Sequence, residues 1–448
     1  MKDASKEGET PALVPERATQ VGERGFRVPS EPSIWTDRML GALDKGVKGG
    51  KWFSLSDKAF SVKTLEAAFR KVKANGGSPG IDRVTIAQFE ERLDEEIPRL
   101  SKSLMDGTYR PQAIKRVWIP KPGSKEKRPL GIPTVRDRVV QGAIRFALEP
   151  IFEKEFCDGS FGFRPGRSCH KALARVWRGL KAGRTYVVDA DLRKCFDTIP
   201  HGFIMRGVEE KVSDGTLLHV IQLFLKQGVM QTGDGEAWEL ESTEGTPQGS
   251  VISPLLANIA LHGLDLLAEA QGLELIRYAD DFVVLCKDRD GAESALAAVK
   301  AWVLASGMSL HPEKTRIVDF AAGESFAFLG YEFKKGFVYP KRKSYQSMQN
   351  KVRAETPRNS GRSLAETISK LNPILRGWYI YYRYVRPGTF GQADGFVRRR
   401  LRSMLSRREG KNLHGGRQDN SRWPNDFFHE RGLFSMERAC ANAQSSPR

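Results

Sequence analysis

Two adjacent carboxylates, Asp280 and Asp281, interrupt an otherwise apolar stretch, IRYADDFVVLC (276–286). The apolar runs on either side predict two strands, so the two acids would lie at the tip of a tight hairpin. Like charges held this close repel each other and raise each other's pKa unless a positive group neutralises them. The pattern therefore predicts a cation opposite this tip.

A second segment supplies further carboxylates. In VVDADL (187–192), Asp189 and Asp191 lie two residues apart and so share one face of the predicted strand. If that strand lies beside the hairpin, three carboxylates can converge. Oxygen ligands without His or Cys favour Mg²⁺, and two such ions about 3.5–4 Å apart activate an attacking 3′-oxygen and stabilise leaving pyrophosphate. The acids therefore predict a polymerase site, with a solvated surface turn as the alternative.

Hydrophobic spacing predicts the elements that must position these acids. Helical spacing begins at Val62. Residues 1–55 show little periodicity and are expected to be mostly disordered, with a short helix near SIWTDRMLGAL (33–43). Further helices are predicted around residues 86–97, 139–151, 253–270 and 292–305, and strands around 113–120, 185–191, 315–320 and 326–333. Beyond residue 340 the pattern is helical and basic.

Charge is distributed unevenly along the 448 residues. The net charge is +18, and residues 334–448 contain 25 Lys and Arg against 8 Asp and Glu, a net charge of +17. A nearly neutral body followed by a strongly basic quarter is typical of a catalytic unit joined to a unit that binds polyanions. No apolar run is long enough to predict a membrane span, and the first 20 residues lack the apolar run of a secretion signal, so none is expected. The five scattered cysteines favour reduced thiols in the cytoplasm over a zinc site or disulfides.

Ten segments, in order, resemble the motifs of reverse transcriptases encoded by bacterial group II introns. They are GGSPGID (76–82), PKPGSKEKRPLGIPTVRDRVVQ (120–141), FGFRPGRSCHKAL (161–173), VVDADLRKCFDTIPH (187–201), GTPQGSVISPLLANIAL (245–261), RYADDFVVLC (277–286), HPEKTRIVDF (311–320), FAFLGYEF (326–333), LNPILRGWYIYYRY (371–384) and RWPNDFFHERGLFS (422–435). The resemblance extends from about Asn75 to the C-terminus.

The resemblance implies an α+β, right-hand polymerase fold with fingers and an antiparallel palm sheet, followed by an α-helical thumb. The expected division is an N-terminal extension (1–55), fingers and palm (56–335), a helical thumb or maturase domain (336–410) and a basic nucleic-acid-binding tail (411–448). Many relatives carry a C-terminal nuclease with paired Cys and His; the single Cys440 of this region leads us to expect none here.

The resemblance also assigns roles around the acids. Asp191, Asp280 and Asp281 would be the catalytic residues and would hold two Mg²⁺ ions with the backbone carbonyl of Leu192, while Asp189 would support them. The incoming nucleotide would be bound by Lys121, Arg128, Phe196, Gln248 and Lys314. In this set Phe196 would exclude a 2′-hydroxyl by its bulk, and Lys314 would protonate leaving pyrophosphate.

Aromatic and basic residues alternate in the C-terminal quarter. GWYIYYRYVRPGTF (377–390) and RRRLRSMLSRR (398–408) offer rings for stacking and guanidinium groups for phosphates. The RNA contacts expected here are Arg376, Tyr382, Arg383, Arg398, Arg399 and Arg400; helical spacing also allows some rings to be core.

The expected function is an RNA-directed DNA polymerase that copies intron RNA into cDNA and binds that RNA to assist splicing and mobility. Its partners would be group II intron RNA, an RNA template with a DNA primer, dNTPs and target DNA. Two alternatives stay open at this point: an RNA-binding splicing factor without polymerase activity, and a domesticated relative that works in repair or phage defence.

Overall fold

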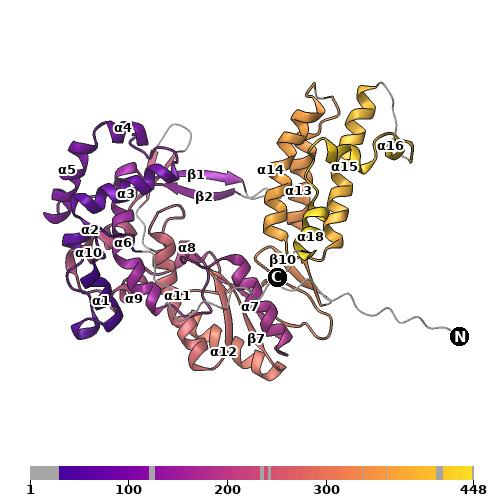
Figure 1. Ribbon diagram of the computed structural model, residues 1–448. Helices are drawn as coiled ribbons and strands as arrows, with labels where there is room; N and C mark the ends of the chain where they lie inside the picture. Colours follow the sequence, from indigo (N-terminus) through magenta and orange to yellow (C-terminus); the bar gives the residue numbers. More distant parts are fainter. Residues whose placement is uncertain are drawn as a thin grey trace. The chain divides into compact units, whose positions relative to one another are not determined.

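In the computed structural model, the described residues are 30–120, 127–232, 237–240, 244–334, 336–359, 361–409 and 417–445. They belong to two compact units that divide between Asp319 and Phe320 (Figure 1). The expected division at residue 335 would instead cut through a three-stranded sheet of the second unit. None of the described helices is long and apolar enough to cross a membrane.

The first unit is built on an antiparallel sheet in the order β6-β7-β3-β8. The strands are β6 (Glu274–Tyr278), β7 (Asp281–Cys286), β3 (Tyr186–Asp191) and β8 (Arg316–Asp319). Every residue from Phe282 to Cys286 is buried, as expected for a strand covered on both faces. The helices that pack on these strands are α7 (Cys169–Lys181), α11 (Ser253–Ala270) and α12 (Arg289–Ala305). The predicted antiparallel palm sheet is thereby confirmed.

A helical layer shares one hydrophobic core with this sheet. It is organised around α6 (Val135–Glu155), whose residues are buried almost throughout. The other helices of the unit are α1 (Asp37–Lys45), α2 (Ser56–Ala59), α3 (Val62–Asn75), α4 (Ile86–Glu91), α5 (Leu93–Met105), α8 (Cys195–Thr198), α9 (His201–Glu209) and α10 (Gly215–Leu225), with a short 3₁₀ turn at Lys48–Gly50.

Residues 30–55, which were expected to be mostly disordered, are folded, and residues 1–29 of the same prediction lie outside the described residues. Ile34 and Trp35 are buried in the core, and the Trp35 indole Nε1 donates to the carbonyl of Phe146 at 2.8 Å. The Asp214 carboxylate accepts the amide of Leu55 at 2.8 Å. These long-range contacts have no periodic signal, which is why hydrophobic spacing missed them. The predicted short helix is confirmed as α1.

A second, mixed sheet has the order β2-β1-β4-β5. Its strands are β1 (Ile114–Pro120), β2 (Lys127–Ile132), β4 (Val229–Thr232) and β5 (Ala237–Leu240), with β1 and β2 forming the predicted hairpin. The amide of Gly131 donates to the carbonyl of Gln248 at 2.6 Å. A Cβ on Gly249 would lie 2.2 Å from the Gly131 carbonyl oxygen, so only glycine permits this approach.

The second unit combines a small antiparallel sheet, in the order β11-β10-β9, with helices. FAFLGYEF, expected as one strand, forms two strands, because Leu329 and Gly330 both have positive φ and reverse the chain. Residues 417–445, expected as a tail, fold into helices, and Phe428 and Met436 are fully buried. The elements are β9 (Phe326–Phe328), β10 (Tyr331–Lys334), β11 (Phe337–Pro340), α13 (Arg342–Glu355), α14 (Leu364–Tyr382), α15 (Gly388–Arg408), α16 (Arg417–Arg422), α17 (Asn425–Glu430) and α18 (Met436–Ser445).

Candidate active site

The two adjacent acids lie at the tip of the β6–β7 hairpin, as predicted. Tyr278 and Asp281 close the hairpin as a cross-strand pair, which leaves Ala279 and Asp280 as the two-residue turn. Ala279 has a φ of +60°, a region that costs a residue with a Cβ roughly 1–2 kcal/mol. The turn therefore has to be held in place by its surroundings.

Arg277 supplies that support from inside the fold. Its side chain is fully buried, and it donates to the Ala279 carbonyl at 3.0 Å. The same guanidinium group binds both carboxylate oxygens of Asp265, at 2.8 and 2.5 Å, and the Asn258 side-chain oxygen at 2.9 Å. A fifth bond, at 2.8 Å, goes to the hydroxyl of Ser160. One buried cation thus ties the turn to α11 and to the loop before α7.

That loop approaches the hairpin so closely that it needs glycine. A Cβ on Gly162 would lie 2.3 Å from the amide nitrogen of Ala279, and one on Gly159 would lie 2.4 Å from the Leu275 carbonyl oxygen. The amide of Phe161 donates to the carbonyl of Arg277 at 2.8 Å. The FGFRPGR segment therefore acts as a backbone brace for the acidic tip.

Asp191 lies directly opposite Asp281 in the β3–β7 register. Side chains of opposite residues share one face of a sheet, and like charges in this position destabilise it. Burial raises the pKa of the Asp280 carboxyl, and the charge of Asp191 raises it further. The three predicted acids are therefore brought together, in an arrangement that favours a bound cation.

Basic side chains surround these acids. Lys314 Nζ lies 2.5 Å from Asp191 Oδ2, and Arg316 lies 3.6 Å from Asp189. Arg128 on β2 and Lys314 both lower the pKa of Asp280, in opposition to burial and Asp191. Lys121, expected beside Arg128, lies outside the described residues.

The donor set suits a divalent ion chemically, since it consists of carboxylates with no His or Cys. Among the described residues, no three His, Cys, Asp or Glu side chains converge closely enough to hold a metal as they stand. The Lys314 ammonium group occupies one cation position beside Asp191. Leu192 and Leu310 form an antiparallel bridge, in which the backbone hydrogen bonds are made by the neighbouring residues Asp191 and Arg193. The Leu192 carbonyl therefore points away from Leu310, toward the β7 side of the chain.

A cavity of about 230 Å³ lies between strands β1, β2 and β4 on one side and residues 196–197 and 244–248 on the other, and Phe196, Gln248 and Arg116 are among its lining residues. The half-buried Phe196 ring meets Phe163 edge to face, with centroids 6.3 Å apart. Gln248 Nε2 donates to Asp197 Oδ1 at 3.2 Å. Two of the five expected nucleotide-binding residues therefore line one cavity.

In the second unit, the structure separates the six expected RNA contacts into two groups. Tyr382 is only 6% exposed, and its ring packs against Trp378 and Tyr331 with centroids 4.9 and 5.0 Å away. It therefore belongs to the core and cannot stack on a base from the surface. Arg400 is tied to Thr356, donating to its hydroxyl and carbonyl at 3.1 and 2.6 Å.

The remaining arginines are available on or near the surface of this unit. Arg376 and Arg383 are exposed and lie over the rings of Phe434 and Tyr384, respectively. Arg398, Arg399 and Arg402 line a cavity of about 520 Å³. Arg398 is 9% exposed, and its buried Nε has no hydrogen-bond partner among the described residues. A cavity with three guanidinium groups is suited to an anion.

Sequence reasoning missed the braces of the acidic tip: Arg277, Asp265, Asn258 and Gly162. The sequence did contain a signal for these buried polar residues. Arg277 lies in an apolar strand, and Asn258 and Asp265, seven residues apart, lie on one face of an apolar helix. Buried polar groups of this kind require partners.

Two family models match the chain. "Reverse transcriptase (RNA-dependent DNA polymerase)" matches residues 119–333, and "Group II intron, maturase-specific domain" matches residues 345–422. Protein YkfC of Escherichia coli is 32% identical over 346 residues, which cover 68% of this chain and 87% of YkfC. The chain belongs to the group II intron reverse transcriptase family.

A further relative and a solved structure also match this reverse transcriptase-family chain. The Group II intron-encoded protein LtrA of Lactococcus lactis is 43% identical over 201 residues, which cover 44% of this chain and only 32% of LtrA. The solved structure of telomerase from Candida albicans covers 81% of this chain and 71% of that chain at 11% identity, with a TM-score of 0.42. Reverse transcriptase domains generally use divalent metal ions, and the two matched domains indicate RNA binding.

Proposed function

We propose that this chain is an RNA-directed DNA polymerase that copies group II intron RNA into cDNA and binds the same RNA to assist its splicing and mobility. One observation carries the polymerase assignment: Asp191 and Asp281 face each other across β3 and β7, with Asp280 at the adjoining tip. Three carboxylates at neighbouring strand ends and the adjoining turn can hold divalent cations, which would neutralise the negative charge of the transferred phosphoryl group.

In this proposal Asp191, Asp280 and Asp281, with the Leu192 carbonyl, hold two Mg²⁺ ions. Bound there, the ions would activate the primer 3′-oxygen and stabilise leaving pyrophosphate. Lys314, which pairs with Asp191 in the free protein, would move to the triphosphate and donate a proton to the leaving group. Lys121 and Arg128 would bind the triphosphate oxygens of the incoming dNTP.

Phe196 and Gln248 would select and orient that dNTP. The cavity that they share is lined by Phe196 and Asp197 of α8, the helix that follows β3 in the chain, and the Phe163 ring meets the Phe196 ring edge to face. A ring placed under the sugar excludes a 2′-hydroxyl by its volume. The Gln248 side chain, held by Asp197, would contact the nucleotide and the template strand.

RNA binding is assigned to the basic second unit, which contains the maturase-specific match. The cavity lined by Arg398, Arg399 and Arg402 would bind a phosphate, because three guanidinium groups line it and the buried Nε of Arg398 has no partner in the part of the chain that the structure describes. Exposed Arg376 and Arg383 would add phosphate contacts to the intron RNA or to target DNA. All five cysteines are free thiols, which supports activity in the bacterial cytoplasm.

The decisive variant is Asp280→Asn with Asp281→Asn, which removes two charges and nearly preserves shape. DNA synthesis from a primer on an RNA template should fall to background, because the remaining acid cannot neutralise two divalent ions. RNA binding and spliced-exon yield should persist, since the basic second unit is unchanged. Both outputs are measured on one preparation of the full chain.

A matched control removes two charges from an exposed helix, with Asp290→Asn and Glu293→Gln on α12. It should retain both activities. Undiminished DNA synthesis in the Asp280/Asp281 variant would refute the polymerase site. A wild-type protein that supports splicing and never extends a primer would instead be an RNA-binding splicing factor.

A further inference from the structure

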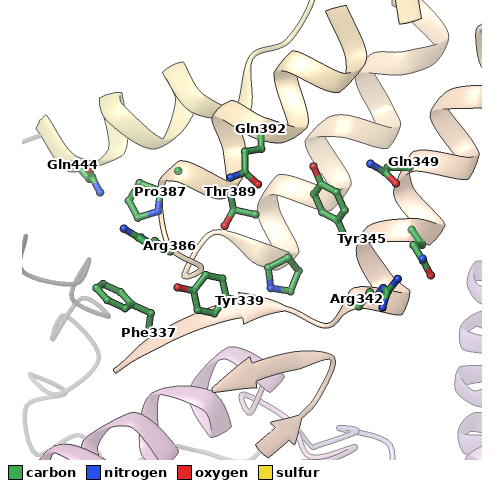
Figure 2. Close-up of a pocket in the computed structure, with 13 residues that line it drawn as sticks. Phe337, Tyr339, Arg342, Tyr345, Gln349, Arg386, Pro387, Thr389, Gln392 and Gln444 are labelled. Carbon is green, nitrogen blue, oxygen red and sulfur yellow. The ribbon is translucent and has the colours of Figure 1, made fainter. Parts of the chain in front are cut away.

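The second unit contains a groove of about 960 Å³ that none of the assigned roles uses (Figure 2). Its wall is formed by β11, the first half of α13, the start of α15 and the last turn of α18. Four glutamines, three aromatic rings and two arginines contribute to it. Among the described residues that line it, none is acidic.

The groove is formed by aligned helix faces. On α13, Arg342, Tyr345 and Gln349 are spaced by three and four residues, which places them on one face of the helix. On α15, Thr389 and Gln392 follow the same rule. Figure 2 shows Tyr345, Gln349 and Arg342 on one side of the groove and Phe337, Tyr339 and Arg386 on the other.

Neighbouring side chains hold two of these rings in place. The Tyr345 ring meets Trp378 edge to face, with centroids 5.9 Å apart and planes at 68°. The Arg386 guanidinium lies over the Phe337 ring at 4.9 Å, and the Arg386 amide donates to the Val338 carbonyl at 2.9 Å. Rings fixed in this way can bind a flat ligand with little loss of side-chain entropy.

The glutamines provide the specificity. Gln349 and Gln392 point toward the groove from two different helices. Each amide offers both a donor and an acceptor, as do the Watson–Crick edges of nucleobases. The arginines supply positive charge for a phosphate, and the volume lies near the upper end of the roughly 300–1,000 Å³ typical of ligand sites.

We propose that this groove binds an unpaired nucleotide segment of RNA. The bases would stack on Tyr345 and its neighbouring rings, their edges would be read by Gln349 and Gln392, and Arg342 and Arg386 would bind the phosphates. A duplex cannot occupy it in this way, because paired bases present neither free faces nor free Watson–Crick edges. The inference rests on the proposed function, since Tyr345, Gln349 and Gln392 lie in the maturase-specific match.

The test compares a fluorescent 12-nucleotide single-stranded RNA with the corresponding 12-base-pair RNA duplex. Anisotropy at fixed salt gives the dissociation constant of the full-length protein for each. Gln349→Ala with Gln392→Ala should weaken single-strand binding roughly tenfold, since two neutral hydrogen bonds are lost. Duplex binding should change by less than about twofold, because phosphate contacts dominate it.

Tyr345 provides a second variant that distinguishes stacking from folding. Tyr345→Leu should weaken single-strand binding by roughly fivefold or more through lost stacking, and Tyr345→Phe should retain it. The control is Gln222→Ala with Gln271→Ala, two exposed glutamines in the other unit. Equal losses for single strand and duplex, or no loss for either, would overturn the groove assignment.

Primer extension at saturating template separates this inference from the proposed polymerase function. The groove variants should extend a primer at the wild-type rate, because they leave the acidic tip intact. If the wild-type protein never extends a primer, and the groove variants still bind the single strand more weakly than wild type with duplex binding unchanged, only the polymerase proposal fails. If extension is normal and the variants bind both RNAs as wild type does, only the groove proposal fails.

Discussion

Replacing Arg277 by Met would test whether the acidic tip depends on one buried cation. The arginine side chain is 0% exposed and its partner Asp265 is 1% exposed. Methionine fills much of the same space but makes none of the five hydrogen bonds. The Asp265 carboxylate would stay buried without a counter-charge, and the Ala279 carbonyl would lose the donor that holds the turn.

The structure sets the size of the effect. Removing one partner of a buried ion pair costs about 3–5 kcal/mol, because the other charge remains desolvated. For a large domain each kcal/mol lowers the melting temperature by about 2–4 °C, so the first unit should melt roughly 6–20 °C earlier. A surface control, Arg145→Met, removes an ion pair that is 38% exposed on the arginine side and should cost about 1 kcal/mol or less.

Calorimetry of the full chain and primer extension at 25 °C would be run on the same samples. The double variant Arg277→Met with Asp265→Leu should recover much of the melting temperature, because it removes both buried charges. It still lacks the bond to Ala279, so its DNA synthesis should stay roughly 10- to 100-fold below wild type through misplaced carboxylates. Arg277 is thus a positioning residue.

Two results would contradict this reasoning. If Arg277→Met melts within about 2 °C of wild type, the network does not stabilise the unit. If the double variant regains full DNA synthesis along with its stability, the bond to the turn has no positioning role and the acids are held by the strands alone.

Three further predictions follow from single side chains. Phe196→Ala should admit ribonucleotides while dNTP addition continues; normal dNTP addition with full rNTP exclusion would refute the steric role. Burial lowers the pKa of His262. As the pH falls below about 6.5, the unfolded chain therefore binds a proton at this histidine before the folded protein does, and the free energy of unfolding should decrease between pH 7 and pH 5. His262→Gln should lessen that drop in melting temperature, and an unchanged drop would contradict the assignment. Arg399→Met should lower the salt slope of single-stranded RNA binding by about 0.7 if the side chain contacts one phosphate, whereas an unchanged slope would exclude that contact.

Strand and hairpin patterns made the centre of the site predictable. The alternation that places Asp189 and Asp191 on one face is a property of any strand, and two acids between apolar runs predict a tight hairpin from neighbouring residues alone. The β1–β2 hairpin and the α1 helix follow from equally local signals. The ordered motifs then supplied the family, which the matches to residues 119–333 and 345–422 support.

Local patterns could not decide which side of a helix faces inward in the second unit. Trp378 and Tyr382 are one helical turn apart on α14 and pack together in the core, whereas Arg376 of the same helix and Arg383 at its C-cap are exposed. The mixed ring and arginine sequence allows either face to be buried until the neighbouring β10 and α15 are placed. For the same reason Arg398 and Arg400, two residues apart, differ in their surroundings. Arg400 donates to Thr356, whereas the buried Nε of Arg398 has no hydrogen-bond partner among the described residues.

The sequence by itself determined the residue types of the acidic site, their strand and hairpin setting, and the separation of a neutral body from a basic quarter, because these depend on neighbours along the chain. Tertiary structure alone decided that Asp191 faces Asp281, that Arg277 is buried against Asp265, and that aligned faces of α13 and α15 form a groove. Each of these pairs residues far apart in the chain. Their proximity depends on strand register and helix packing, which no local pattern encodes.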